Sequence, residues 1–426
     1  DEATQIHMSR DYDYFFLQGD LARLRFDPDA PLTSEVQLRL INGTLSKYLM
    51  GLAWHVAGYT QADLNTDWDW GADWDYNVAA GHLPSDGLLT ATRLPSALLT
   101  AVGAWIVFAL GWQLGGRWTA YGALLYYTLS PGLLLNGRRA MMEGALTCFS
   151  LLALLAGVWV LRRKSWAAVL FLGVAAGLTI ASKHTGAAVI ASIFAACALG
   201  FAFIATRDMF RQRDYGVALG AFGQHVLKLA AAGMLALAVF FVLNPAWWGA
   251  DLSRLVPTIL DWRQELLAGQ AHDHNGYAEP LANAEGFARQ VFLAQPQYFE
   301  ARTWREIQPI ADQIAAYEAS PWPGIALGGS AAGAGVMLLL LGAGIFALLR
   351  DPELELAVRL PVGVWALTMA LVAFISPVEW QRYYLPFYPA IGLLGAYGPF
   401  GIARWWRKIR AEREAKRAAQ QTQETI

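Results

Sequence analysis

Nine long apolar segments restrict what this chain can fold into. They lie near residues 94–115, 118–136, 140–161, 166–183, 185–206, 222–244, 325–349, 358–376 and 385–403. Most approach the ~20 residues that an α-helix needs to cross the roughly 30 Å hydrocarbon core of a bilayer. In lipid the backbone polar groups must pair within the segment, which favours helices. The sequence therefore predicts an all-α polytopic membrane protein.

The composition supports a membrane protein over a soluble one. Hydrophobic residues make up 56% of the chain and charged residues 15%, whereas soluble domains carry about 25% charged residues. The net charge of -2 gives no basic field that would attract nucleic acid. Cys148 and Cys197 lie inside apolar runs, so we interpret them as small core residues and not as a disulfide or metal pair.

Two polar regions interrupt the apolar segments and set the domain organisation. We expect an extracytoplasmic loop with an amphipathic helix at 38–58, and a second extracytoplasmic loop later in the chain. The predicted regions are a loop at 1–92, transmembrane helices at 93–244, a loop at 245–324, transmembrane helices at 325–403 and a basic cytoplasmic tail at 404–426.

Lysine and arginine in short connectors predict the orientation, because such connectors stay in the cytoplasm. With nine spans, four basic segments fall on one side of the membrane. They are Leu161–Lys164, the connector with Arg207, Arg211 and Arg213, the connector with Arg350 and Arg359, and the tail from Arg404. We therefore expect a multi-pass protein of the plasma (inner) membrane whose site faces the extracytoplasmic side.

Carboxylates stand out on that expected outer side. Asp1 and Glu2 form an acidic pair that can act as a general base, although a solvated chain end has the same composition. Glu143 lies about one turn inside an expected span, where a carboxylate is costly unless it is paired or faces a wet cavity. Arg139 is four residues earlier, so an ion pair along the helix is the alternative interpretation.

Cations lie on the same side. Lys183 closes a hairpin between two spans, and Arg382 opens the last span. Both residue types bind phosphate, lysine as a point charge and arginine with two parallel hydrogen bonds. The alternative for each is a side chain that reaches from a helix end to the membrane surface.

Two other patterns resemble metal sites. The alternating acids between Asp67 and Asp75 look like a calcium loop but lack the twelve-residue ligand pattern. His272 and His274 have no further clear ligand nearby. We expect no cofactor and no obligatory metal. A divalent metal is not supported by the sequence.

The order of several short motifs resembles the GT-C glycosyltransferases of the dolichyl-phosphate-mannose protein mannosyltransferase type, including the bacterial aminoarabinose transferases. The resemblance covers most of the chain. The motifs that carry it are Asp1-Glu2, Arg93-Leu94-Pro95-Ser96-Ala97, Ser130-Pro131-Gly132 through Arg139-Ala140-Met141-Met142-Glu143, Gly177-Leu178 through Ser182-Lys183-His184-Thr185-Gly186, and Arg382-Tyr383-Tyr384-Leu385-Pro386 with Tyr388-Pro389-Ala390. In that family a membrane helix precedes the acidic pair, so we expect the full protein to carry one.

The resemblance implies a membrane glycosyltransferase that moves a sugar from a polyprenyl-phosphate donor to an acceptor hydroxyl with inversion. Asp1 would be the general base, and Glu2 and Glu143 would tune it or position the sugar. The implied donor-phosphate ligands are Lys183, Arg382, Arg138 and Arg139, and the candidate sugar or acceptor contacts are His7, His184 and Tyr383.

Two other functions remain open from the residues alone. A lipid or sugar transporter or flippase also uses ionisable residues in a membrane protein. A non-catalytic protein that binds a lipid-linked sugar is the other alternative. The sequence leaves the sugar, the acceptor (lipid, glycan or protein) and the oligomeric state open, and it gives no sign of a nucleic-acid partner.

Overall fold

A computed structural model of the protein describes residues 1–29, 33–212, 215–273, 276–277, 279–293, 295–300, 302–321, 323 and 330–424. Every regular element in these residues is a helix, and they contain no strand. The predicted all-α class is confirmed for the part of the chain that is described. The expected amphipathic helix at 38–58 corresponds to two helices. Helix α2 (Ser34–Ile41) begins before this stretch and ends inside it, and α3 (Leu45–Val56) lies within it.

Among the described residues, six helices are long and apolar enough to cross a membrane. They are α5 (Asp86–Gly115), α8 (Glu143–Arg163), α10 (Gly186–Gln212), α11 (Tyr215–Leu243), α16 (Ala331–Arg350) and α17 (Leu356–Phe374). The most apolar stretch of α8 is 78% buried by other helices, whereas that of α11 is 17% buried. Helix α8 is therefore central in the bundle, and α11 leaves most of its surface for lipid.

The remaining helices complete this multi-pass membrane protein. Around the bundle lie α6 (Arg117–Leu129), α7 (Pro131–Arg138), the shorter apolar helix α9 (Trp166–Ser182) and the long α19 (Tyr388–Glu424). Outside it lie α1 (Glu2–Met8), α4 (Trp74–Ala79), α12 (Leu252–Asp273), α13 (Pro280–Ala288), α14 (Gln308–Glu318) and α18 (Gln381–Tyr384).

The expected single span at 118–136 is wrong, because the chain forms two helices there. Ser130 is extended, with φ -83° and ψ 106°, and separates α6 from α7. The reason is Pro131, since proline disfavours helical backbone at the residue before it and lacks an N–H donor. Proline then fits the first turn of α7, where that N–H would have no partner in the helix.

The expected span at 140–161 begins later than its hydropathy indicates. Arg139 is extended, with φ -64° and ψ 149°, and α8 starts at Glu143. Glu143 therefore lies at the helix N-terminus, where the helix dipole favours a negative charge. The alternative interpretation of Glu143, an ion pair with Arg139 along one helix, is wrong, because Arg139 is not in that helix.

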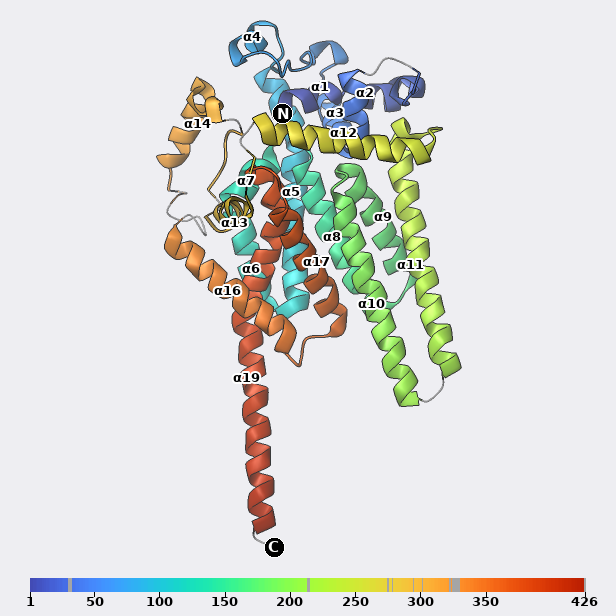
Figure 1. Cartoon of the computed structure of the whole chain (residues 1–426), viewed down its shortest axis with the longest axis vertical. Helices are drawn as coiled ribbons and strands as arrows, with labels where there is room; N and C mark the ends of the chain where they lie inside the picture. Colours follow the sequence, from blue (N-terminus) through green and yellow to red (C-terminus); the bar gives the residue numbers. More distant parts are fainter. Residues whose placement is uncertain are drawn as a thin grey trace.

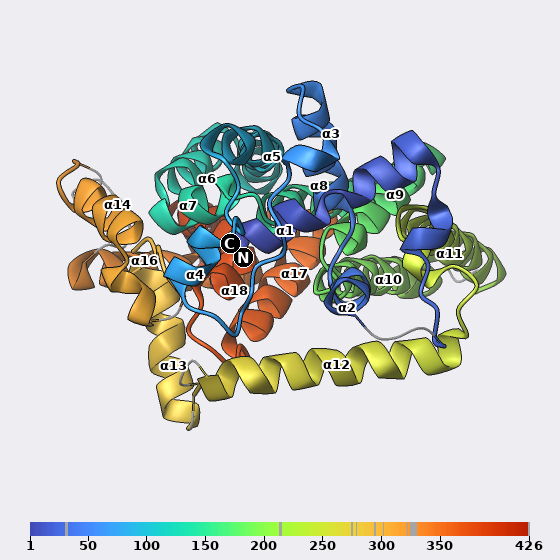
Figure 2. The same cartoon turned by 90° about the horizontal axis from the view of Figure 1, so that it is seen from above.

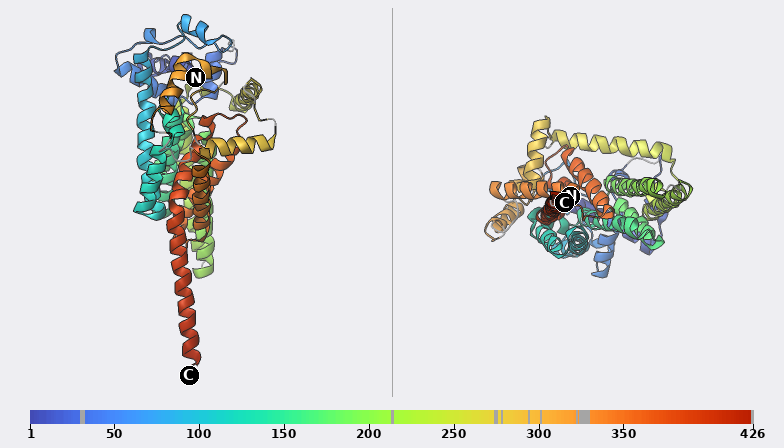
Figure 3. Two further views of the ribbon diagram at one scale, coloured as in Figure 1. Left: turned by 90° about the vertical axis from the view of Figure 1, so that its left-hand side faces the viewer. Right: turned by 90° about the horizontal axis from the view of Figure 1, so that it is seen from below.

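The two ends of the bundle differ in what covers them. Figure 1 shows α1, α2, α3, α4, α12 and α14 gathered at one end, while α19 extends far beyond the bundle at the other. Viewed from above in Figure 2, α12 runs along one side of this cover, and α1 and α2 lie over the bundle. The side view in Figure 3 separates the cover from the projecting α19.

The basic connectors meet at the end from which α19 projects. Arg162 at the end of α8 pairs with Glu355 before α17 at 2.7 Å. Arg404 of α19 pairs with Asp351 at 2.7 Å, and Asp351 is fully buried between α16 and α17. These contacts join three chain regions that the sequence analysis grouped on one side.

Candidate active site at the covered end of the bundle

A cavity of about 1030 Å³ lies between the cover and the bundle. Its walls come from α1, α2, the loop at 67–72, the segment before α8, α12, and the segments around residues 300–304 and 380–383. Of the predicted site residues, five line it: Asp1, Glu143, Lys183, Arg382 and Tyr383. Chain regions almost 400 residues apart therefore supply one site, as expected for residues on the same side of the membrane.

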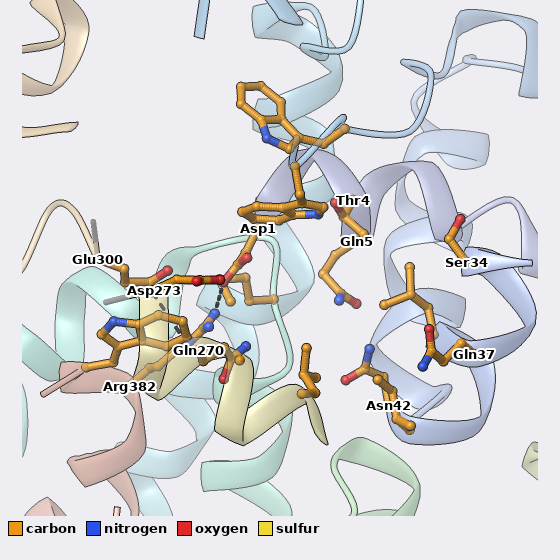
Figure 4. A pocket seen from close by; sticks show the side chains of 18 of the residues that line it. Asp1, Thr4, Gln5, Ser34, Gln37, Asn42, Gln270, Asp273, Glu300 and Arg382 are labelled. Carbon is orange, nitrogen blue, oxygen red and sulfur yellow. Dashed lines mark hydrogen bonds and ion pairs between the residues drawn. The ribbon is translucent and has the colours of Figure 1, made fainter. Parts of the chain in front are cut away.

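Asp1 and Arg382 form the ion pair at the centre of the charged part of the cavity (Figure 4). The Arg382 side chain is only 8% exposed, and its Nε lies 3.4 Å from Oε1 of Glu300. Burial lowers the pKa of this guanidinium, and Tyr383 offsets part of that shift. The same Glu300 oxygen is 3.9 Å from Nη1 of Arg139.

Glu2 is held behind this pair and faces the bundle. Nε of Arg93 donates to Glu2 Oε1 at 2.7 Å, and the backbone N–H of Ala140 donates to the same oxygen at 2.7 Å. Burial alone would raise the pKa of this carboxyl, but Arg93, Ala140 N–H and the charge of Arg139 together lower it. Glu2 therefore stays ionised and ties α1 to α5 and to the segment before α8.

Lys183 and Glu143 form a second ion pair. Lys183 Nζ donates to Glu143 Oε1 at 2.8 Å, and the two side chains are 9% and 3% exposed. The Tyr383 ring lies against both cations, 5.4 Å from Lys183 Nζ and 5.4 Å from the Arg382 guanidinium. Oε2 of Glu143 is buried and has no hydrogen-bond partner among the described residues.

Charges balance across the described part of this cluster. The carboxylates are Asp1, Glu2, Glu143 and Glu300, and the cations are Arg93, Arg139, Lys183 and Arg382. Each cation lies within 4 Å of a carboxylate, which limits the cost of removing these charges from water. An incoming anion must therefore exchange with a carboxylate to reach any of these four cations.

The other part of the cavity carries uncharged polar side chains. Figure 4 shows Ser34, Gln37 and Asn42 on the side away from Arg382 and Glu300, with Gln5 between the two groups. Asn42 is held here because the backbone of its neighbour Gly43 packs directly against the backbone of Ser182. A Cβ at Gly43 would lie 2.3 Å from the Ser182 carbonyl oxygen. Only glycine allows this approach of the α2–α3 connector to the residues before Lys183.

Indole rings form part of the rim. The Trp70 and Trp304 rings stack with centroids 6.3 Å apart and planes 17° apart. Trp68 is 8% exposed and packs edge-on against Trp304 at 6.5 Å. The loop at 67–72 and the segment after Glu300 are thereby joined across the cavity mouth.

Other predicted site residues lie outside the cavity lining. Arg138 is exposed, unlike its neighbour Arg139, which donates to the carbonyl oxygens of Gln297 and Tyr298 at 3.3 and 3.2 Å. His7 hydrogen-bonds through Nδ1 with the Asn65 carbonyl at 2.9 Å. His184 packs edge-on against Phe240 and Trp247, and burial lowers its pKa to about 4.

Sequence reasoning did not identify Glu300 or the role of Arg93. Glu300 lies in the long loop at 245–324, where nothing in the sequence distinguishes one acid from another. Arg93 was noted only within a motif, although its position just before an apolar run was a signal. A basic residue at the membrane boundary and an acidic pair expected on the same side were candidates for an ion pair.

The two patterns weighed as metal sites have other roles or fall outside the structure. Asp73 caps α4 by accepting from the Tyr76 N–H at 2.8 Å, and Asp69 accepts from the Gly71 N–H at 2.9 Å. His274 lies outside the described residues. Within the described residues no group of three His, Cys, Asp or Glu side chains is placed to hold a metal ion. Cys148 and Cys197 are buried, free thiols.

One family model matches part of the chain. Residues 83–223 match the model of the dolichyl-phosphate-mannose-protein mannosyltransferases. This stretch contains Arg93, Arg139, Glu143 and Lys183, and it confirms the resemblance that the motifs indicated. No curated protein matches the sequence.

Solved structures resemble the chain over most of its length. ArnT from Cupriavidus metallidurans in the apo state is 15% identical, with a TM-score of 0.48 over 93% of this chain and 54% of that one. The same protein bound to undecaprenyl phosphate is 16% identical, with a TM-score of 0.45 over 96% of this chain and 57% of that one. The oligosaccharyltransferase of Archaeoglobus fulgidus in the apo form is 14% identical, with a TM-score of 0.43 over 98% of this chain and 48% of that one. The chain thus spans about half the length of these structures.

Proposed function

We propose that the protein is a membrane glycosyltransferase that moves a sugar from a polyprenyl-phosphate donor to an acceptor hydroxyl. The observation that carries this proposal is the Asp1–Arg382 ion pair in a cavity of about 1030 Å³ at one end of the helix bundle. A carboxylate base held by a phosphate-binding cation fits this chemistry. The family match over residues 83–223 supports the lipid-phosphate donor.

Phosphate binding would rearrange the charged part of the cavity. The donor phosphate takes the place of Asp1 at Arg382 and of Glu143 at Lys183, since arginine and lysine both bind phosphate well. Arg139 adds a third positive charge beside Glu300. This exchange leaves the Asp1 carboxylate free of its cation, and so available to accept a proton, only when donor is bound.

The reaction then follows from the positions of these groups. The acceptor hydroxyl attacks the anomeric carbon and gives its proton to Asp1. The bond between that carbon and the phosphate oxygen breaks, and the phosphate leaves with the electron pair. Lys183 and Arg382 stabilise the growing charge on the phosphate. Attack from the side opposite the leaving group inverts the anomeric configuration.

The membrane location follows the same argument. The basic connectors joined by Arg162–Glu355 and Arg404–Asp351 lie at the end opposite the cavity. Since basic connectors remain in the cytoplasm, the cavity faces the extracytoplasmic side of the plasma (inner) membrane. A donor lipid in the outer leaflet reaches the cavity while its tail stays in the bilayer.

Turnover by the full-length protein in membranes tests this function. Radiolabelled dolichyl-phosphate mannose is supplied with a mixture of lipid, glycan and protein acceptors, and release of lipid phosphate is followed. Asp1→Asn keeps the shape of the side chain but removes the base, so turnover should fall about 10²- to 10⁴-fold.

Three results would reject the proposal. Wild-type turnover that Asp1→Asn leaves unchanged removes Asp1 as the base. Binding of the donor without turnover, across several sugars and acceptors, favours a non-catalytic binding protein. Movement of intact donor across vesicles would instead identify a flippase.

A further inference from the structure

Helix α1 connects the charged and uncharged parts of the cavity. Asp1 precedes its first turn, and Gln5 follows four residues later, so both lie on one face of the helix. Four residues of helix rise by about 6 Å, which is close to the width of a hexose ring. Gln5 is therefore one sugar ring away from the carboxylate placed at the reacting carbon.

Two polar atoms of α1 are buried beside the cavity without a partner. Thr4 and Gln5 line the cavity and are 4% and 6% exposed. Thr4 Oγ1 and Gln5 Oε1 have no hydrogen-bond partner among the described residues. Buried polar atoms in folded proteins are nearly always paired, because leaving them unpaired is costly. Both side chains line the cavity, so a rotation about the last bonds of either one would present its oxygen to a ligand that donates hydrogen bonds.

The surrounding side chains define the chemistry of that ligand. Ser34, Gln37 and Asn42 also line this part of the cavity, and none carries a charge. Amide groups both donate and accept hydrogen bonds, as sugar hydroxyls do. None of these five side chains is a cation, and Ser34 Oγ donates to the Asp67 carboxylate at 3.3 Å. A carboxylate repels phosphate but accepts hydrogen bonds from hydroxyls, so the group favours a neutral ligand rich in hydroxyls.

We propose that Thr4 and Gln5, with Gln37 and Asn42 opposite them, form a recognition subsite for sugar hydroxyls. This inference rests on the proposed transferase function and adds the residues that select the sugar. The hydroxyls belong either to the donor sugar or to a glycan acceptor. Both sources present the same chemistry to Gln5, and binding measurements separate them.

Isosteric variants test the subsite. Thr4→Val and Gln5→Met remove the hydrogen-bonding atoms but keep the size of the side chains. Binding of three probes to the purified full-length protein is measured: dolichyl-phosphate mannose, dolichyl phosphate and methyl α-mannoside. Each variant should weaken binding of a sugar-bearing probe by about three- to tenfold and leave dolichyl phosphate affinity unchanged.

Thermal stability of the ligand-free protein supplies a second measurement. Each variant removes an unpaired buried polar atom, so Tm should stay the same or rise. A residue with only a structural role would lower Tm when replaced. Thr119→Val is the matched control, because Thr119 Oγ1 is also buried and unpartnered but lies in α6 away from the cavity. It should leave all three affinities unchanged.

The pattern of affinities identifies the source of the hydroxyls. Weaker binding of dolichyl-phosphate mannose alone assigns the subsite to the donor sugar, and weaker binding of methyl α-mannoside assigns it to a glycan acceptor. Equal loss for dolichyl phosphate, or no loss for any probe, overturns the subsite. These binding results do not depend on turnover, so a protein that binds sugar without transferring it rejects the transferase function only.

Discussion

The charged and uncharged parts of the cavity satisfy their polar groups in opposite ways. Asp1, Lys183 and Arg382 each have an oppositely charged partner within the protein, whereas Thr4 Oγ1 and Gln5 Oε1 have none among the described residues. The charged part can therefore bind an anion only by exchange of partners. The uncharged part can bind hydroxyls directly. In the proposed function, the residues that bind the donor phosphate are therefore not the residues that select the sugar.

Breaking one pair of the charged part should have the largest effect. Lys183→Ala leaves Glu143 buried at 3% exposure with no cation, and an uncompensated buried charge costs about 3–5 kcal/mol. The free energy of unfolding in detergent should fall by that amount, and donor binding should be lost.

The double variant Lys183→Met with Glu143→Leu separates these two effects. It removes both charges together, so stability should largely return while donor binding stays absent. Donor affinity equal to wild type in the double variant would contradict the assignment of Lys183 to the phosphate.

Disturbing the connector between the two parts should have an intermediate effect. In Gly43→Ala the new Cβ would lie 2.3 Å from the Ser182 carbonyl oxygen, so the connector must shift at a cost of about 1–3 kcal/mol. Asn42 and Lys183 should move apart, raising the KM for donor and for glycan acceptor together. Gly220→Ala in α11 is the control, because nothing lies within 4 Å of its Cβ, and it should be neutral or slightly stabilising.

A smaller effect should distinguish two adjacent arginines. Arg139→Ala removes a cation beside Glu300 and its bonds to the carbonyl oxygens of Gln297 and Tyr298. Donor affinity should fall about tenfold, as for a hydrogen bond to a charged group. Arg138→Ala removes an exposed side chain outside the cavity lining and should change affinity by less than about twofold. Equal effects would place both residues in the site.

The smallest effect concerns His184, which lies outside the cavity lining. Its pKa is about 4 in the folded state, below the ordinary 6.5, so the unfolded chain binds a proton between these values more readily. Stability is complete above pH 6.5, falls as pH drops from 6.5 to 4, and changes no further below that. In His184→Phe, the drop in Tm between pH 6.5 and pH 4 should be about 2–4 °C smaller than in the wild type. An unchanged pH dependence of Tm would contradict the lowered pKa of His184 as its cause.

Part of this site could be predicted from the sequence, because charged residues stand out next to long apolar segments. Lys183 and Arg382 were identifiable because they flank spans, and their common side followed from the basic connectors. Glu143 was found, but its partner was not, because hydropathy does not reveal that Arg139 is extended and that α8 begins after it. The helix break at Ser130 was visible in Pro131, yet the surrounding apolar residues masked it.

The uncharged part of the cavity left no comparable signal. Gln5 and Asn42 are ordinary polar residues in the sequence, and nothing in their spacing indicates a cavity. The position of Asn42 depends on the contact of Gly43 with the end of α9. That contact joins segments about 140 residues apart, so only the folded structure brings Asn42 into the cavity that Asp1 and Gln5 line.

The exchange of Asp1 for a donor phosphate at Arg382 is the central claim, and equilibrium binding of dolichyl phosphate tests it most directly. Asp1→Asn removes the carboxylate that competes with phosphate for Arg382. We predict that this variant binds dolichyl phosphate several-fold more tightly than wild type while its transfer activity is lost. Weaker or unchanged binding would contradict the exchange, because Asp1 would then not compete with the phosphate.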